Sequence, residues 1–219
     1  MTLFASLIPF VCWLVYARVI GQADRWRPSL TTLMRAQRRR WVSNAVRRET
    51  PFDAILSSTI MGAVSFFAST TVLLILTLFA VFGQVGAIHD ALAAISPASH
   101  FTGTELRVHL AVLLAMFSLA FLDFTLSLRQ FNHYCILLGA VDHHHAPDEA
   151  EVDAITALNA LGARYFNNGI RAYYFSAASM AWFISAGAAI AATLIVVAFV
   201  VYREFFSAPY AIVEKLRDR

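Results

Sequence analysis

The stretch Phe121-Leu-Asp-Phe-Thr-Leu-Ser-Leu-Arg-Gln-Phe-Asn-His-Tyr-Cys135 decides the fold class, because it keeps a helical apolar spacing while it admits polar side chains. An unbroken apolar run, residues 110–122, leads into it. At about 100° per residue the polar side chains form two stripes. They are Asp123, Ser127 and Gln130 on one, and Thr125, Arg129, Asn132 and His133 on the other. A membrane helix with two polar stripes is not stable alone in lipid, so we expect it to be the hub of a helix bundle.

The composition indicates an integral membrane protein. Hydrophobic residues make up 59% of the 219 residues and charged residues 14%, whereas soluble domains carry about 25% charged residues. A hydrocarbon core of about 30 Å requires roughly 20 apolar residues. We therefore predict an all-α fold, a single transmembrane domain over residues 1–219 with four membrane helices in one bundle. The predicted spans are residues 3–20, 52–82, 107–140 and 171–202.

The arginine distribution predicts the orientation of the spans. Segment 21–50 contains eight arginines, while segment 84–104 contains no Lys or Arg. The positive-inside rule then places segment 21–50 and the 141–171 connection in the cytoplasm. With four spans, both termini are expected outside the cytoplasm, in a bacterial inner membrane.

Within the basic segment, residues 29–46 have the pattern of an amphipathic helix, with Leu33 and Trp41 on its apolar side. Such a helix typically lies flat on an anionic membrane surface. We therefore expect Trp41 at the lipid interface, and either a simple topology anchor or a docking surface for a lipid or partner. The residues of that docking surface are Arg35, Arg38, Arg39, Arg40 and Trp41.

Small residues at helical spacing predict close helix packing in lipid. They occur at Ser58, Gly62, Ser65 and Ser69 in the second span and at Ala181, Ser185, Ala188 and Ala192 in the fourth. We expect both faces to contact the hub helix. Between the third and fourth spans, Pro147 and the acidic residues after it mark a helix start. That helix is predicted to end near Arg164, because Asn167-Asn168-Gly169 is typical of a helix break.

Asp123 is the acidic residue that needs explanation. If the third span enters the hydrocarbon near His109, Asp123 lies about 21 Å deep, where a charge costs about 2.5–3.5 kcal/mol or more. Arg129 is about 9 Å farther along the same helix, so the cation must come from another helix, and Arg171 is the best-placed candidate. We predict a polar cluster that is either a structural ion pair or an ion site. Its members are Asp53, Asp123, Arg129, His133, Asn167 and Arg171.

No pattern in the sequence indicates a cofactor or a catalytic centre. His143, His144 and His145 are weak metal candidates, but adjacent residues do not converge on one ion, and a polar turn is the favoured interpretation. Cys12 and Cys135 lack metal-ligand or redox spacing. The chain has no GxSxG, HExxH or glycine-rich phosphate loop. We therefore predict no metal, no cofactor and no enzymatic activity.

Several motifs resemble a known family. They are Arg40-Trp41, Met61-Gly-Ala-Val-Ser-Phe-Phe-Ala-Ser-Thr70, Ser127-Leu-Arg-Gln-Phe-Asn-His133, residues 164–175 and Trp182. Together they resemble the bacterial and plant membrane family catalogued as domain of unknown function 599. The resemblance implies four membrane helices in one domain and no established chemistry. This chain departs from it at residues 55–60, where Arg-Asn is expected before Met61.

Two functions remain open. The first is a non-catalytic accessory or scaffold subunit that acts by association with a membrane complex. The alternative is a small homo-oligomeric channel or transporter that uses the polar cluster around Asp123, Arg129 and Arg171. The expected partners are the lipid bilayer and either a membrane protein or a second copy of the chain. The basic charge reflects mainly one membrane-facing loop, so no nucleic acid is expected.

Overall fold

The computed structural model describes residues 2–48, 51–95, 102–144 and 148–216, and these residues form helices joined by short turns. No strand occurs within them. The elements are α1 (Thr2–Ala23), α2 (Leu30–Ala45), α3 (Phe52–Phe82), α4 (Val85–Ile95), α5 (Gly103–Gly139), α6 (Glu149–Ser179), the 3-10 helix η1 (Met180–Phe183), α7 (Ala186–Phe205) and α8 (Ala208–Glu214).

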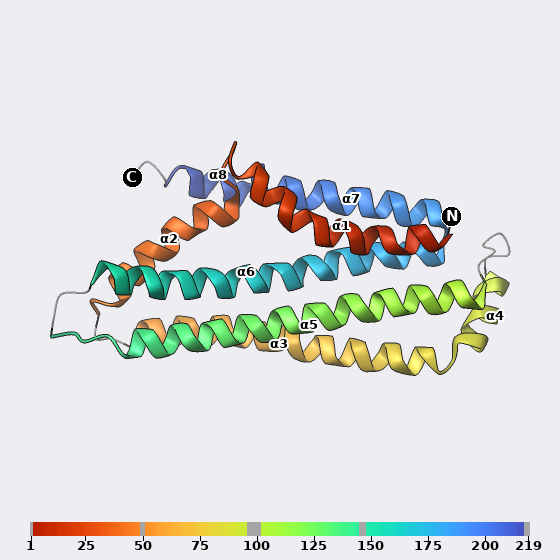
Figure 1. The fold of residues 1–219 in the computed structure, drawn as a ribbon, viewed down its shortest axis with the longest axis horizontal. Helices are drawn as coiled ribbons and strands as arrows, with labels where there is room; N and C mark the ends of the chain where they lie inside the picture. Colours follow the sequence, from red (N-terminus) through yellow and green to blue (C-terminus); the bar gives the residue numbers. More distant parts are fainter. Residues whose placement is uncertain (1, 49–50, 96–101, 145–147, 217–219) are drawn as a thin grey trace.

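Four of these helices, α1, α3, α5 and α7, are long and apolar enough to cross a membrane. This confirms the prediction of an all-helical chain with four helices long enough to span a membrane, and the family resemblance agrees with it. Figure 1 shows all four running roughly along the longest axis of the molecule. The same view shows α6 running beside α5 over most of its length. α6 is therefore a fifth long helix along this axis, and it extends beyond Arg164, where the sequence predicted its end.

The predicted fourth span, residues 171–202, is wrong. Residues 171–179 belong to α6, the chain turns through η1, and α7 begins only at Ala186. Ser185 is the N-cap of α7, with extended backbone (φ −168°, ψ 160°) and a side chain that accepts a hydrogen bond from Ala188 N. The hydroxyl satisfies a backbone donor at the helix start, so the turn occurs inside a continuous apolar run where hydropathy gives no signal.

The predicted end of α6 near Arg164 is also wrong, because the helix continues through Asn167-Asn168-Gly169 to Ser179. Gly169 serves a close approach between helices rather than a C-cap. A Cβ atom at this position would lie 2.6 Å from Cε1 of Phe124 on α5. The predicted start of this helix is confirmed, with Asp148 as N-cap and Glu149 and Glu151 in the first turn.

The start of α1 and the last helix, α8, lie toward opposite ends of the molecule. Figure 1 shows the N-terminal end of α1 near the end of the molecule that holds α4, and α8 toward the opposite end, beside α2. The prediction that both termini lie outside the cytoplasm stays a prediction.

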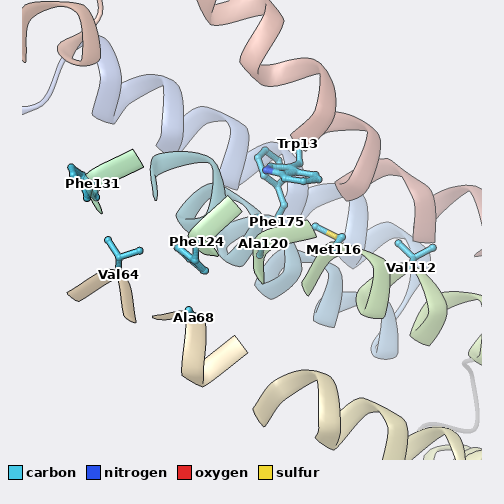
Figure 2. Packing of buried hydrophobic residues seen from close by; sticks show 10 residues of the cluster. Trp13, Val64, Ala68, Val112, Met116, Ala120, Phe124, Phe131 and Phe175 are labelled. Carbon is cyan, nitrogen blue, oxygen red and sulfur yellow. The ribbon is translucent and has the colours of Figure 1, made fainter. Parts of the chain in front are cut away.

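Buried aromatic and aliphatic side chains fill the centre of the molecule. Figure 2 shows ten of them, contributed by α1, α3, α5 and α6, including Trp13, Phe124 and Phe175. The ring of Phe67 on α3 stacks on Phe124 at 5.6 Å between centroids, and the ring of Phe166 on α6 lies 5.9 Å from Phe124. Such offset and tilted aromatic pairs add to the stabilisation from burial.

α5 is a central helix, as expected, because it packs against α1, α3, α4 and α6. The expectation that the second and fourth spans both pack against the third span through their small faces is wrong. α7 packs mainly against α1, α6 and η1, and its buried residues are Ala189, Thr193, Val200, Glu204 and Phe205. The predicted small face of the fourth span is therefore not the face that is buried.

The small face of α3 also points away from the hub. Ser58, Gly62, Ser65 and Ser69 are all exposed, and a Cβ atom at Gly62 would meet nothing within 4 Å. The helix instead buries Asp53, Ser57, Val64, Ala68 and Thr71. Thr71 lies close to α6, where its hydroxyl is 2.6 Å from that of Tyr173. The predicted stripe therefore exists, but nothing in the described chain covers it.

Candidate functional site

α2 is fixed to the body of the protein by its apolar face. Leu33, Val42 and Ala45 are buried, and the helix packs against α6, α7 and α8. Figure 1 shows it lying obliquely across the end of α6. The prediction that this face rests on a membrane surface is wrong, because other helices of the chain cover it.

Trp41 joins α2 to α3 and α5. Its Nε1 donates a hydrogen bond to Oδ1 of Asp53 at 2.6 Å, and its ring lies 5.8 Å from that of Tyr134. Nη2 of Arg48 donates to the same Asp53 oxygen at 3.0 Å. Asp53 is 4% exposed, so these two donors compensate much of the cost of burying its charge.

A cavity of about 890 Å³ lies beside Asp53, between the start of α3 and the end of α5. His143 and His144 line it together with Asp142, and His145 lies outside the described residues. Within the described residues no three His, Cys, Asp or Glu side chains are grouped so that they could hold a metal ion. Oδ2 of Asp53 has no hydrogen-bond partner among them.

Two of the predicted docking arginines are engaged within the chain. Arg39 forms ion pairs with Glu149 and with Asp153, the latter at 2.8 Å. Nη1 of Arg38 donates a hydrogen bond to Oδ1 of Asn159, which makes a second link between α2 and α6. Burial lowers the pKa of the Arg38 guanidinium from its ordinary value. Arg35 and Arg40 remain exposed.

The predicted pairing of Arg171 with Asp123 is wrong. Nη2 of Arg171 lies 3.5 Å from Oε2 of Glu204, and the two side chains are 8% and 2% exposed. The guanidinium also lies over the ring of Tyr16, 5.1 Å from its centroid. Oε1 of Glu204 accepts hydrogen bonds from the backbone N–H of Thr31, at 3.1 Å, and from its hydroxyl. α1, α2, α6 and α7 thus meet at one buried charge pair.

The remaining members of the predicted polar cluster do not join this pair. Asp123 is half-buried and makes no ion pair within the described residues, while Arg129 and His133 are exposed. Asp53 lies with Trp41 and Arg48, as described above. Only Asn167 lies near the end where Arg171 is found, in the wall of a second cavity. The six residues of the predicted polar cluster therefore lie in different parts of the molecule.

The second cavity has a volume of about 450 Å³ and lies between α2, α6 and α7. Four arginines line it, Arg35 and Arg38 from α2, Arg164 from α6 and Arg203 from α7, with Glu204 as the acid in its wall. Sequence reasoning missed Glu204, Arg203 and Arg164 as site residues. The signal that could have found the first two is an Arg-Glu pair directly after the apolar run that ends at residue 202.

A family model described as "Protein of unknown function, DUF599" matches residues 4–209. No curated protein and no solved structure matches the chain.

Proposed function

The chain belongs to the DUF599 family of proteins of unknown function, and we propose that it is a non-catalytic accessory protein that acts by association within the membrane. The outward stripe of α3, formed by Ser58, Gly62, Ser65 and Ser69, is the observation that carries this proposal. Its occupant is a transmembrane helix of a partner protein.

The environment of α3 supports this role. α3 packs mainly against α5, with α4 near its end, so one long side of the helix has no covering within the described chain. Large side chains on that exposed surface, such as Phe66 at 66% and Leu73 at 65% exposure, are suited to lipid. The small stripe is different, because the bare backbone at Gly62 allows another helix to approach closely, which is how helices associate in lipid.

The channel or transporter has less support. The aromatic side chains of Phe67, Phe124 and Phe166 pack together between α3, α5 and α6, where a channel would need polar groups. The charge of Arg171 is compensated by Glu204, so this arginine is not available to a permeant ion. A homo-oligomer nevertheless remains an outcome of the test below.

Adding bulk to the stripe should abolish the association. We expect Gly62→Leu to release a co-purifying membrane protein that the wild-type chain retains in mild detergent, because the leucine holds the partner backbone away. Ala63→Leu is the matched control, since Ala63 is exposed next to the stripe on the same helix. Native mass spectrometry of affinity-purified protein measures both. A clean homo-oligomer that Gly62→Leu breaks would support the alternative instead, and identical complexes from both variants would exclude the stripe as a contact.

We propose that α6 crosses the membrane together with the four apolar helices, and these five passes predict on which side each end of the chain lies. We propose that α4 and the N-terminus lie outside the cytoplasm, and that α2 and α8 lie inside, because the arginine-rich segment 21–50 includes α2. In a Cys12→Ala/Cys135→Ala background, an impermeant maleimide should label Ala94→Cys in spheroplasts. It should label Ala36→Cys and Ala211→Cys only after permeabilisation. Labelling of position 211 from outside while position 36 stays protected would restore the four-pass topology.

A further inference from the structure

The cavity between α2, α6 and α7 carries an excess of positive charge that the described residues do not compensate. Its four arginines come from three different helices, and its wall contains a single acid, Glu204. That carboxylate is already engaged by Arg171 and by both donors of Thr31. The cavity therefore has the charge of an anion site.

None of the four arginines is paired with a carboxylate among the described residues. Nη1 of Arg203 donates to the hydroxyl of Tyr174 at 3.0 Å, and Arg38 donates to the amide oxygen of Asn159. Arg164 lies over the ring of Tyr165 at 5.8 Å. Nearby arginines differ, because Arg39 and Arg48 each pair with an acid. Arg38 and Arg203 are half-buried, where unpaired charge is costly, while Arg35 and Arg164 are exposed at the same cavity.

The geometry points to a phosphate ester as the ligand. Guanidinium groups offer paired donors that match the oxygens of a phosphate, and several of them can bind one group from different sides. The volume of about 450 Å³ exceeds what a bare phosphate needs and is within the usual range of small-molecule sites. Leu30, Met34 and Leu161 line the same cavity and provide apolar contact for the organic part of the ester.

We propose that this cavity, lined by Arg35, Arg38, Arg164 and Arg203, binds a phosphate ester. Arg203 follows directly after the apolar residues of α7, which is the level at which lipid phosphates lie when such a helix crosses a bilayer. The phosphate can therefore belong to a lipid headgroup or to a soluble ester. The two sources share one binding chemistry and differ in whether acyl chains are needed.

The test uses the full chain in mild detergent with two probes, dioctanoyl phosphatidylglycerol and glycerol 3-phosphate. Dioctanoylglycerol and glycerol are the phosphate-free controls, and binding is followed by native mass spectrometry and by the shift in melting temperature. We expect Arg35→Gln/Arg164→Gln to weaken binding by about 100-fold, because each lost charge-assisted hydrogen bond weakens it about tenfold. Both side chains are exposed, so the melting temperature without probe should stay at the wild-type value.

Arg40→Gln/Arg47→Gln is the matched control, since it removes the same charge from exposed positions outside this cavity. Retained binding in this control supports the site. Binding of glycerol 3-phosphate indicates a soluble ester, and binding of phosphatidylglycerol alone indicates a lipid headgroup. If neither probe binds better than its phosphate-free counterpart, or if both double variants lose binding equally, the site does not exist.

Discussion

Glu204→Leu should lower the free energy of unfolding by about 3–5 kcal/mol, because it leaves the buried guanidinium of Arg171 without its carboxylate. It also removes the acceptor of both Thr31 hydrogen bonds, which loosens α2 from α7. For a chain of this length, the apparent melting temperature in detergent should fall by roughly 10 °C. Thermal unfolding followed by circular dichroism measures the change.

A double substitution distinguishes a lost pair from general damage. Arg171→Met/Glu204→Met should recover most of the stability, since apolar residues of similar length often replace a buried ion pair without loss. Asp123→Asn is the matched single control and should behave like wild type, because Asp123 is half-buried and unpaired within the described chain. A harmless Glu204→Leu, or an Asp123→Asn as damaging as Glu204→Leu, would contradict the pairing.

Gly169→Ala should destabilise the protein by about 1–3 kcal/mol, although alanine is the better helix former by about 1 kcal/mol. The added Cβ atom would lie 2.6 to 2.9 Å from three ring atoms of Phe124. That ring is fully buried and is held between Phe67, Phe166 and Tyr173. Because these rings surround it, the ring must displace a neighbour to make room, so we expect the clash to outweigh the gain in helix propensity. The melting temperature in detergent reports the loss.

Gly62→Ala is the control for this substitution. It introduces the same atom into the middle of a helix where nothing lies within 4 Å, so only the gain in helix propensity remains and stability should rise. Phe124→Leu should partly restore the Gly169→Ala variant by opening space for the new methyl group. Equal stability of the two alanine variants would mean that α5 and α6 are not as close as described.

The membrane class and most of the helices could be predicted from the sequence, because they depend on properties of single segments. Summed hydropathy over about 20 residues identified α1, α3 and α5 near their observed limits. The start of α6 followed from local capping by Asp148 and its acidic neighbours. Both predictions use only the residues of one segment and do not depend on what that segment packs against.

The candidate site could not be predicted in the same way. The sequence analysis proposed Arg171 as the cation for Asp123, but its partner is Glu204, 33 residues away in α7. Arg35, Arg38, Arg164 and Arg203 come together only because α2 crosses α6 near the end of α7. Sequence patterns report which side of one helix a residue occupies, and they contain no information on which other helix lies opposite.

α6 shows most clearly which features sequence patterns predict and which features depend on tertiary packing. It contains Asn159, Asn167 and Arg171, and it is absent from the helices that are apolar enough to cross a membrane by themselves. Because α1, α2, α5 and α7 surround it, its polar groups bind Arg38 and Glu204 instead of facing lipid. Hydropathy measures what a helix requires when lipid is its neighbour, so the sequence determined the helices that face lipid. Only the tertiary structure decided the course of α6, the helix that the others cover.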